Sequence, residues 1–534
     1  MKKHLKSFLV ALMAGILLMA SFGCGGPDYQ TDELGRYYLD EDGNRVYELV
    51  MYDHGFVLPD VPEHREEVLA AINERLLKEL GYKVDIQVLC FPDDQYDTKV
   101  TTDLAGEVVI DMLRIGSKET LTSYANQEML RDLTDEVKDL DEMNEYLLAH
   151  NENIWMETTV NGKIYGIPSP TFTCYRGSWI RGDYLKKAGV VDENGNAKVP
   201  STFAELETAL EKLSAPGIMD GRRTVTWAVL LDELEGLILG NFTDTPGDFL
   251  DEDGNIMPKF FDPGYKAFIK KVHEWYKLGY VDNLLFDATY ENVHSYLQQG
   301  NTAIAGSNLW GLEWGSLKEI DAQNPDMDIR FLGYMDDSYK NSTTGFATDI
   351  LIIPYTSINY KVMLQFFNWA MYNKENYSLV YNGLEHVTFE YEDNGSTRVP
   401  DAYKDDPNVS MPNNIFGKFL VGGNVEWNTE WSANESVPEQ SIVAYQKSLT
   451  MPAEKIYVPP TVYTQVKLDD MIQLEKGTAD TTWKESLQAL IKDKTLTDSE
   501  FDAKWAQMLE KYEADGGLKA YAEYTKVYKT LNFN

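Results

Sequence analysis

The chain has 534 residues, more than a single hydrophobic core needs, so two or more lobes are expected. Apolar residues make up 43% and aromatic residues 12%, which is enough for packed cores and excludes an intrinsically disordered chain. The net charge of −38, from 86 acidic and 48 basic residues, repels phosphate backbones and argues against nucleic-acid binding.

Residues 1–23 predict a signal peptide. Three lysines among the first six residues form a basic start, and residues 8–19 are an apolar run too short to span a bilayer. Ser21-Phe22-Gly23 before Cys24 resembles a bacterial lipoprotein cleavage site, so we expect Cys24 to become the lipid anchor. Ordinary secretory cleavage, with Cys24 incidental, is the alternative. No later apolar run is long enough to predict a transmembrane helix.

The region after the cleavage site is expected to be a short tether followed by a hairpin, at residues 24–46. Residues 25–35 are polar and glycine-rich, as is typical of a tether, and Asp42-Gly43 is a hairpin signal. The cysteines that remain are Cys90 and Cys174, for which one disulfide and two free buried thiols are both plausible. The 7 histidines form no cluster or zinc motif, so no structural zinc site is expected.

The next segments predict alternating strands and helices. Residues 48–52 are a short apolar strand, and residues 65–80 place apolar side chains on one helical face that ends at Gly81. Residues 84–90 alternate as a half-exposed strand, and residues 108–115 form an apolar strand interrupted by Asp111. This order predicts an α/β fold with a mainly parallel sheet.

Helices dominate the later part of the chain. A capping box at Thr202 and Glu205 starts a helix that runs through Leu213. A second apolar helical face starts at Tyr265 and ends at Gly279. The remaining expected features are a turn at 251–255, a strand at 348–354, a helix at 361–372, loops at 390–440, and helices from 468 with breaks near Gly477, Lys494 and Gly516.

Residues 160–190 combine a polar turn, a Gly166-Ile167-Pro168 breaker and an aromatic run. GKIYGIP at 162–168 resembles the G-K-x-Y-G-x-P signature of extracellular solute-binding lipoproteins of carbohydrate ABC importers, the family 1 relatives of maltose-binding protein. Further segments resemble motifs of this family in the same order, at 179–185, 200–206, 299–304 and 344–354. The resemblance covers roughly residues 45–385.

The resemblance implies a two-lobed, periplasmic-binding-protein-like (type II) α/β fold with a hinge and an interlobe cleft. Residues 47–168 and 346–460 would form lobe 1, and residues 169–345 and 461–534 would form lobe 2 with the C-terminal helices. Gly166 and Pro168 would supply the breaker in the first crossing between the lobes, and the aromatic run 172–175 would open onto the cleft.

The implied function is oligosaccharide capture without catalysis. The lobes would close over the sugar by hinge motion and deliver it to the transmembrane subunits of an ABC permease. The protein would be a monomer, lipid-anchored on the extracytoplasmic face of the cell membrane, without a nucleic-acid partner. One alternative is a surface glycoside hydrolase, which needs two opposed carboxylates. Another is a binder of peptides or other solutes on the same fold.

A sugar site needs aromatic rings for the C–H faces of the ligand and polar side chains for its hydroxyls. Trp310 and Trp314 follow the strand at 302–306, where the family presents a ring to the ligand, although their spacing also fits two core residues of one helix. Trp427 and Trp431 repeat this spacing in a polar, loop-like region. Trp227 lies in an apolar strand and is expected in the core.

Polar candidates stand at the ends of the predicted strands. Asp53 and His54 end the first strand, at the carboxyl edge where α/β sheets bind ligands, and Arg114 and Ser117 end the third strand. The remaining candidates follow the hinge, end the 302–306 strand region or match a family loop near the cleft: Phe172, Tyr175, Arg176, Asn308, Glu385 and His386.

Calcium is the metal to consider, because some relatives that bind acidic sugars carry an EF-hand-type loop. The loop that starts at Asp192 has ligand spacing at positions 1, 3 and 5, but position 12 is Phe203. The loop that starts at Asp251 has Ile256 where a glycine is required. We therefore expect plain turns and no cofactor, with calcium as the alternative.

Overall fold

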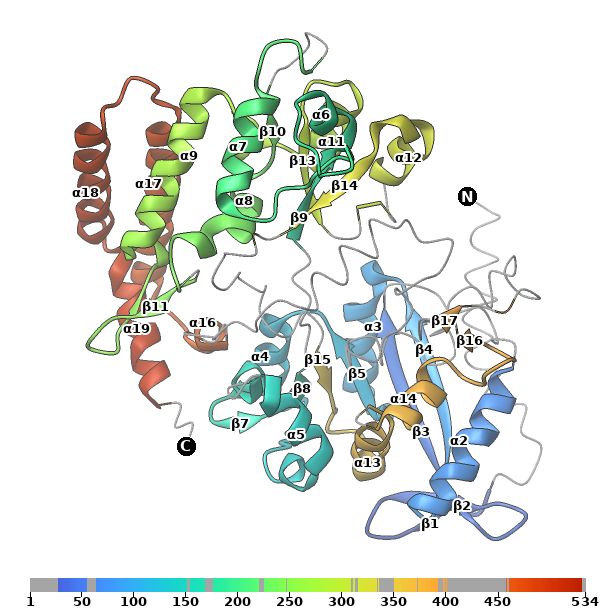
Figure 1. Cartoon of the computed structure of the whole chain (residues 1–534). Helices are drawn as coiled ribbons and strands as arrows, with labels where there is room; N and C mark the ends of the chain where they lie inside the picture. Colours follow the sequence, from blue (N-terminus) through green and yellow to red (C-terminus); the bar gives the residue numbers. More distant parts are fainter. Residues whose placement is uncertain are drawn as a thin grey trace, which may run out of the picture.

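Two β-sheets organise the protein, and the elements around them form the lower and upper parts of Figure 1. The computed structural model describes residues 27–54, 64–150, 154–168, 176–219, 225–245, 247–308, 311–312, 316–333, 335, 350–371, 373–391, 397–398, 400, 458 and 461–530.

Within the described residues the first sheet has the order β1-β2-β3-β5-β15-β8, and β4 also pairs with β3. β3 is parallel to β4 and β5, whereas β2 and β15 run antiparallel to their neighbours. The predicted α/β fold is confirmed, but the sheet is mixed, since the N-terminal hairpin and the returning strand β15 run the other way. The strands are β1 (Gln30–Thr31), β2 (Arg36–Leu39), β3 (Arg45–His54), β4 (Lys83–Phe91), β5 (Met112–Ile115), β8 (Gly166–Pro168) and β15 (Ile350–Ile352).

Helices cover both faces of this sheet, because alternate side chains of β3 point to opposite sides. Leu49 and Met51 pack with α2 (Arg65–Glu79), whereas Tyr52 packs with α3 (Asp93–Ala105). The helix predicted over 65–80 is confirmed, with Val68, Leu69, Ile72 and Leu76 buried. On the α2 side the core also includes α5 (Asp141–His150), α13 (Tyr360–Met371) and α14 (Lys374–Tyr381), and on the α3 side it includes α4 (Lys118–Asn126).

The second sheet has the order β10-β13-β9-β14 among the described residues. Its inner strand β9 (Arg176–Arg181) is followed by α6 (Gly182–Lys187). Trp227 is 1% exposed in β10 and belongs to the core, as predicted. The other strands and flanking helices are β10 (Trp227–Ala228), β13 (Ile304–Asn308), β14 (Ile329–Leu332), α7 (Phe203–Leu213), α8 (Leu231–Ile238), α9 (Pro263–Leu278), α11 (Tyr290–Gln298) and α12 (Ser316–Gln323).

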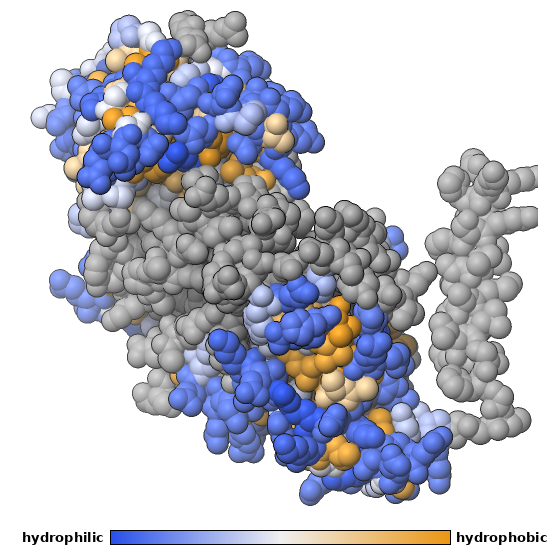
Figure 2. All heavy atoms as spheres, turned by 45° about the vertical axis from the view of Figure 1, so that its right-hand side comes forward, coloured by the Kyte–Doolittle hydropathy of each residue, from blue (hydrophilic) through white to orange (hydrophobic). Residues whose placement is uncertain are grey.

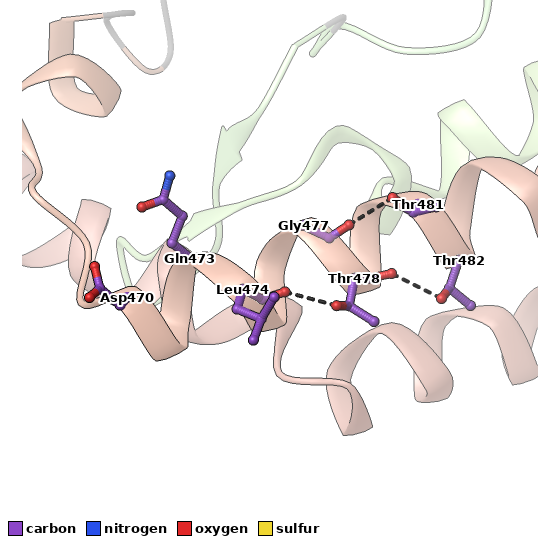
Figure 3. Close-up of a pocket in the computed structure, with 7 residues that line it drawn as sticks. All are labelled: Asp470, Gln473, Leu474, Gly477, Thr478, Thr481 and Thr482. Atoms are coloured by element: carbon purple, nitrogen blue, oxygen red, sulfur yellow. Dashed lines mark hydrogen bonds between the residues drawn. The ribbon is translucent and has the colours of Figure 1, made fainter.

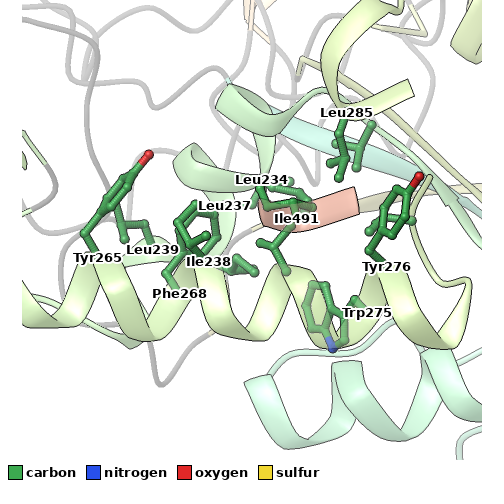
Figure 4. Close-up of a cluster of buried hydrophobic side chains, with 14 of the residues drawn as sticks. Leu234, Leu237, Ile238, Leu239, Tyr265, Phe268, Trp275, Tyr276, Leu285 and Ile491 are labelled. Carbon is green, nitrogen blue, oxygen red and sulfur yellow. The ribbon is translucent and has the colours of Figure 1, made fainter. Parts of the chain in front are cut away.

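The larger core of the second sheet centres on α9. Phe268 lies beside the side chains of α8, Tyr276 lies on the side of Leu285, and Ile491 of a C-terminal helix lies between them (Figure 4). The Trp275 ring stacks on Phe203 of α7, with 6.1 Å between the ring centroids. The predicted apolar face is therefore confirmed, and Gly279 ends the helix with a φ of 73° that glycine tolerates. Burying each of these large side chains contributes roughly 1.5–3 kcal/mol relative to exposure.

The C-terminal helices are α16 (Thr461–Gln465), α17 (Asp470–Lys492), α18 (Asp498–Ala514) and α19 (Gly517–Thr530). Breaks occur near Lys494 and Gly516 as predicted, but the expected break at Gly477 is wrong because α17 runs through it. Thr478 and Thr481 follow this glycine and donate to the carbonyl oxygens of Leu474 and Gly477 (Figure 3). These threonine hydroxyls are therefore satisfied within an uninterrupted helix.

α16 contacts both parts of the molecule. On one side Tyr463 donates to Asp248 (2.8 Å) and packs its ring against Tyr524 of α19. On the other side Thr464 bonds with Thr122 of α4 (2.7 Å), and Gln465 donates to the carbonyl oxygen of Thr159 (2.7 Å). The C-terminal helices are thus tied to the first sheet through one short helix.

The chain also passes between the two sheets after β8 and again before β15. β8 ends at Pro168, whose register partner Ile350 begins β15, so the chain leaves and re-enters the first sheet at one edge. In the second sheet β9 begins at Arg176 beside the end of β13. Residues 169–175 connect these two edges, and a segment of that length spans at most about 28 Å. The described ends of the two sheets therefore lie no more than about 28 Å apart.

Two predicted features near the N-terminus need correction. The tether predicted at 25–35 is wrong for its second half, because β1 at 30–31 pairs with β2, which extends the first sheet beside β3. The predicted strand at 108–115 begins only at Met112, because the buried carboxylate of Asp111 accepts from the backbone N–H of Val50 (3.0 Å) and from Ser357. The Asp111 carboxylate thus accepts the Val50 N–H in place of a backbone carbonyl oxygen of a neighbouring strand. The hairpin at Asp42-Gly43 is confirmed.

The Gly166-Ile167-Pro168 segment is a strand rather than a breaker. All three residues are buried in β8, and β8 pairs with β15. The preceding turn at Asn161-Gly162 is confirmed: both residues have positive φ, as a two-residue hairpin between β6 (Thr159–Val160) and β7 (Lys163–Ile164) requires.

The short elements that remain are η1 (Glu136–Asp139), η2 (Ile154–Thr158), η3 (Leu239–Asn241), β11 (Phe249–Leu250), β12 (Ile256–Met257), η4 (Lys259–Phe261), α10 (Leu284–Asp287), η5 (Pro325–Met327), β16 (Glu390–Tyr391) and β17 (Thr397–Arg398). The predicted loops at 390–440 otherwise lie outside the described residues. In the part of the chain that the structure describes, no helix has the length and apolarity to cross a membrane. Hydrophilic residues cover most of the coloured surface in Figure 2, with hydrophobic residues gathered in limited areas.

Replacing Gly166 by alanine is expected to destabilise the protein. A Cβ there would lie 2.6 Å from Cγ2 of Ile350 and 3.1 Å from the carbonyl oxygen of Leu351, so β8 and β15 would have to move apart. We expect the free energy of unfolding to fall by about 1–3 kcal/mol. Gly477→Ala is the matched control: nothing lies within 4 Å of a Cβ there, and alanine in an exposed helix interior stabilises by about 0.5–1 kcal/mol. Urea unfolding checks both signs, and a stable Gly166→Ala variant would contradict this packing.

Candidate functional site

β3 and β5 part at the carboxyl edge of the first sheet. Their pairing comprises Met51 with Met112 and Tyr52 with Leu113, after which β3 continues beside β4 and β5 beside β15. The chain passes from β3 to β4 on one side and then crosses to β5 on the other, with α2 and α3 on opposite faces. Such a topological switch point leaves a crevice outside the strand ends, where open α/β sheets bind ligands. We call this place the fork.

Side chains replace the backbone ladder at the fork. Arg114 Nε donates to Asp53 Oδ1 (2.5 Å), and its Nη2 donates to the carbonyl oxygen of His54. The Arg114 and Asp53 side chains are 6% and 1% exposed. Asp53 Oδ1 also accepts from the backbone N–H of His54 (2.7 Å). Because a buried ion pair persists only when further hydrogen bonds offset its desolvation, these extra bonds define the geometry of the fork. Three of the predicted site residues therefore meet at one place.

Tyr96 of α3 closes the fork from one face of the sheet. Its hydroxyl donates to the carbonyl oxygen of Arg114 (2.7 Å) and approaches that of Tyr52 (3.2 Å), so it joins the ends of both strands. Its ring lies 4.7 Å from the ring of His54 between centroids. Burial, with the charge of Asp53 nearby, raises the pKa of Tyr96 well above its ordinary value, so the hydroxyl stays a donor.

The fourth strand-end candidate, Ser117, has a structural role. It is the N-cap of α4 and accepts from the backbone N–H of Thr120 (3.1 Å). The next residue, Lys118, is buried and forms an ion pair with Glu157, which is 0% exposed. Ser117 thus starts a helix that brings a second buried ion pair close to the fork.

The edge of the second sheet that the crossing reaches is formed by β9 and β13. Two of the residues predicted from the sequence, Arg176 and Asn308, are register partners at this edge. Their side chains lie outside the described part of the chain. Gly306 lies two positions before Asn308 in β13, and the buried carboxylate of Glu233 packs so closely against it that a Cβ there would collide. A carboxylate is therefore part of this second edge.

Glu385 and His386 lie on an exposed turn rather than at the fork itself. Their side chains are 49% and 76% exposed, and His386 has a φ of 65°. A Cβ on the neighbouring Gly383 would lie 3.2 Å from Val68 in the first turn of α2, which places the turn near the start of that helix. The other predicted residues lie outside the described residues: Cys24, Phe172, Cys174, Tyr175, Trp310, Trp314, Trp427 and Trp431.

Sequence reasoning missed Tyr96, Phe91 and Lys99. Phe91 is the register partner of His54, and its ring lies 6.4 Å from that of Tyr96 and 5.8 Å from Lys99 Nζ. A signal existed for Phe91, which ends its strand as His54 does. Tyr96 and Lys99 lie within a helix, where no local pattern distinguishes a residue that reaches the fork from a core residue.

The two loops with calcium-like spacing are closed by their own hydrogen bonds. Asp192 accepts from the backbone N–H groups of Asn194 and Asn196, at 2.9 and 2.8 Å. Asp251 does the same for Asp253 and Asn255. Among the described residues no group of three or more acidic, histidine or cysteine side chains could hold a metal ion. Both loops behave as Asx turns.

Comparisons with known proteins give the fold a context. No family model matches the chain. A carbohydrate ABC transporter substrate-binding protein from Streptococcus pneumoniae serotype 4 is 23% identical over 403 residues, covering 74% of this chain and 75% of that protein.

Solved structures extend this likeness over the chain. The N-glycan transport solute binding protein (NgtS) from Streptococcus pneumoniae has a TM-score of 0.53 at 20% identity, and the alignment covers 91% of this chain and 99% of that protein. The HMO binding ABC-transporter associated solute binding protein from Bifidobacterium longum infantis has a TM-score of 0.53 at 15% identity, covering 90% and 99%. The chain has the two-lobed, periplasmic-binding-protein-like fold of such proteins, and the resemblance inferred from its motifs is confirmed.

Removal of the Tyr96 hydroxyl is expected to weaken the fork. Tyr96→Phe leaves the carbonyl oxygens of Arg114 and Tyr52 without this donor in a buried place, which should cost about 1–2 kcal/mol of unfolding free energy. Tyr355→Phe is the control, because its hydroxyl also donates to a backbone carbonyl (3.1 Å) but the residue is 43% exposed and water can replace it. Chemical denaturation measures both, and equal effects would argue against a buried role for Tyr96.

Proposed function

We propose that this chain, which shares its fold and sequence pattern with substrate-binding proteins of carbohydrate ABC transporters, captures an oligosaccharide and delivers it to a membrane permease. The observation that carries the proposal is the fork, where polar groups gather at a topological switch point, on the edge where the chain crosses to the second sheet. The ligand would lie between the two facing edges, and hinge motion would close the lobes over it.

The chemistry of the fork suits a sugar. Hydroxyl groups need polar surroundings, and Asp53, Arg114 and His54 gather polar groups at this end of the sheet. The rings of His54, Tyr96 and Phe91 add apolar faces beside these polar groups. Trp310, Trp314, Trp427 and Trp431 remain candidates for further rings, together with the hinge residues Phe172, Tyr175 and Arg176 and the residues Asn308, Glu385 and His386.

We assign the lobes as residues 47–168 with 346–460, and residues 169–345 with 461–534. The packing of α17 beside α9 in one core supports placing the C-terminal helices with the second sheet. Among the C-terminal helices α16 differs, because it forms hydrogen bonds with residues of both lobes.

The proposed setting is the extracytoplasmic face of the cell membrane, with Cys24 as the lipid anchor and the protein as a monomer. The anchor would raise the local concentration of the loaded protein near the permease subunits. A protein that passes ligands on has no need of catalysis. The relatives named above are, in keeping with this, binding proteins.

The rival functions are a surface glycoside hydrolase and a binder of peptides or other solutes. A hydrolase needs two opposed carboxylates about 5–10 Å apart. In the described part of the fork, Asp53 has its Oδ1 held by Arg114 and the His54 N–H, which suits a fixed acceptor better than an acid or a nucleophile. Peptide binding is separated from sugar binding only by experiment, because the fold does not fix the ligand.

Thermal unfolding against a panel of oligosaccharides, with peptides as controls, tests the proposal. For the mature chain carrying Cys24→Ser, a sugar present at 100 times its dissociation constant should add about 2.7 kcal/mol of stability, and chromatography should detect no product. His54→Ala should bind that sugar at least about tenfold more weakly, whereas Gln473→Ala, on the α17 face shown in Figure 3, should not change the affinity. Stabilisation by peptides alone, or release of a shorter sugar, would overturn the proposal.

Cys24→Ser is expected to release the protein from the membrane. Without the cysteine no acyl chains can be attached, and the described remainder contains no helix that could cross a bilayer. Fractionation of cells expressing the wild type and the variant measures the change. Equal membrane association of the two proteins would contradict the lipid anchor and favour ordinary secretory cleavage.

A further inference from the structure

Positive charges around the fork are already matched by carboxylates. Three cations of the described chain lie on elements at this edge, and each forms an ion pair: Lys99 with Asp103, Arg114 with Asp53, and Lys118 with Glu157. An ion pair cancels most of the field that either charge alone would project toward a ligand.

The two buried pairs are fixed in place. In the Arg114–Asp53 pair the side chains are 6% and 1% exposed, and in the Lys118–Glu157 pair they are 10% and 0% exposed. Arg114 is held further by its bond to the carbonyl oxygen of His54, which orients the guanidinium plane. Breaking a buried pair to serve a ligand would leave a buried carboxylate without its partner, which is strongly unfavourable.

The pair of Lys99 and Asp103 lies beside the aromatic rings of Phe91 and Tyr52. Lys99 Nζ is 2.5 Å from Asp103 Oδ2, and 5.8 Å from the centre of the Phe91 ring. Asp103 also accepts from the hydroxyl of Tyr52 (2.7 Å). Lys99 is 43% exposed, so it is the cation that a small change could make available.

The opposite edge adds negative rather than positive charge among its described side chains. The carboxylate of Glu233 packs against Gly306 of β13, and the whole chain carries a net charge of −38. A ligand carboxylate entering between the edges would lose its hydration and meet cations that are already neutralised.

We propose that the ligand of this site is a neutral oligosaccharide, and that sugars with uronic acid carboxylates are rejected. This inference rests on the proposed function, and it specifies the chemical class of the ligand. A neutral sugar needs no counter-charge, so the ion pairs can stay intact when it binds, whereas a carboxylate needs a cation of its own.

Matched sugar pairs that differ only by oxidation at C6 test the inference. Isothermal titration calorimetry of the mature Cys24→Ser chain would compare manno-, gluco- and galacto-oligosaccharides with the uronic acid oligomers of the same linkage, and would add neutral N-glycans. We expect a neutral sugar to bind, and its oxidised counterpart to bind at least about tenfold more weakly because the carboxylate is left uncompensated. Equal or tighter binding of a uronate would overturn this inference and leave the sugar-binding proposal intact. Binding of no sugar would overturn both.

Asp103→Asn tests the inference in the opposite direction, by a gain of uronate binding. The amide keeps an acceptor for the Tyr52 hydroxyl, whereas Lys99 loses its counter-charge beside Phe91. Uronate binding should then improve about two- to fivefold, with the affinity for the neutral sugar unchanged. Arg176→Gln is the complementary variant, because Arg176 lies at the opposite edge. If wild-type protein bound uronates and this variant lost that binding, the site would be one for acidic sugars, and the inference would be wrong.

Discussion

The Arg114–Asp53 ion pair holds two parallel strands together at the point where their backbone hydrogen bonds end. A parallel sheet that sends successive connections to opposite faces must separate somewhere, and the separated ends leave carbonyl and N–H groups that require partners. Arg114 and Tyr96 supply those partners from β5 and α3. The same groups that stabilise the parting of the strands thereby form the walls of a polar crevice.

The connections between the two sheets give that crevice its place in the fold. The chain leaves the first sheet at Pro168 and returns at Ile350, beside the same strands, so the crevice and the crossing share one edge. A third link runs through α16, where Tyr463 faces the C-terminal helices and Gln465 faces the first sheet. Relative motion of the lobes would have to bend these links while the buried ion pairs of the first sheet stay fixed, because cores deform less readily than short connections.

Charge has different roles at long and short range in this protein. The excess of acidic residues keeps the surface repulsive toward polyanions. This long-range repulsion affects how a molecule approaches the protein, not the contacts that it makes inside a site. Around the fork, in contrast, the described cations and carboxylates are matched in pairs. A site built in this way offers oriented hydrogen-bond donors and acceptors with little net field, which is suited to a neutral polar ligand.

The sequence by itself determined the elements whose burial follows a local period. The apolar face of α9, the face of α2 and the Asp42-Gly43 hairpin depend on spacing within a few residues, and all are confirmed. It also placed Asp53, His54 and Arg114 at strand ends, as candidates. Only the tertiary structure decided the roles of Asp111, whose partner Ser357 is 246 residues away, and of Gly166, which packs on Ile350. It alone brought Tyr96 to Arg114, because sheet order and helix crossing set such distant contacts, and no local period encodes them.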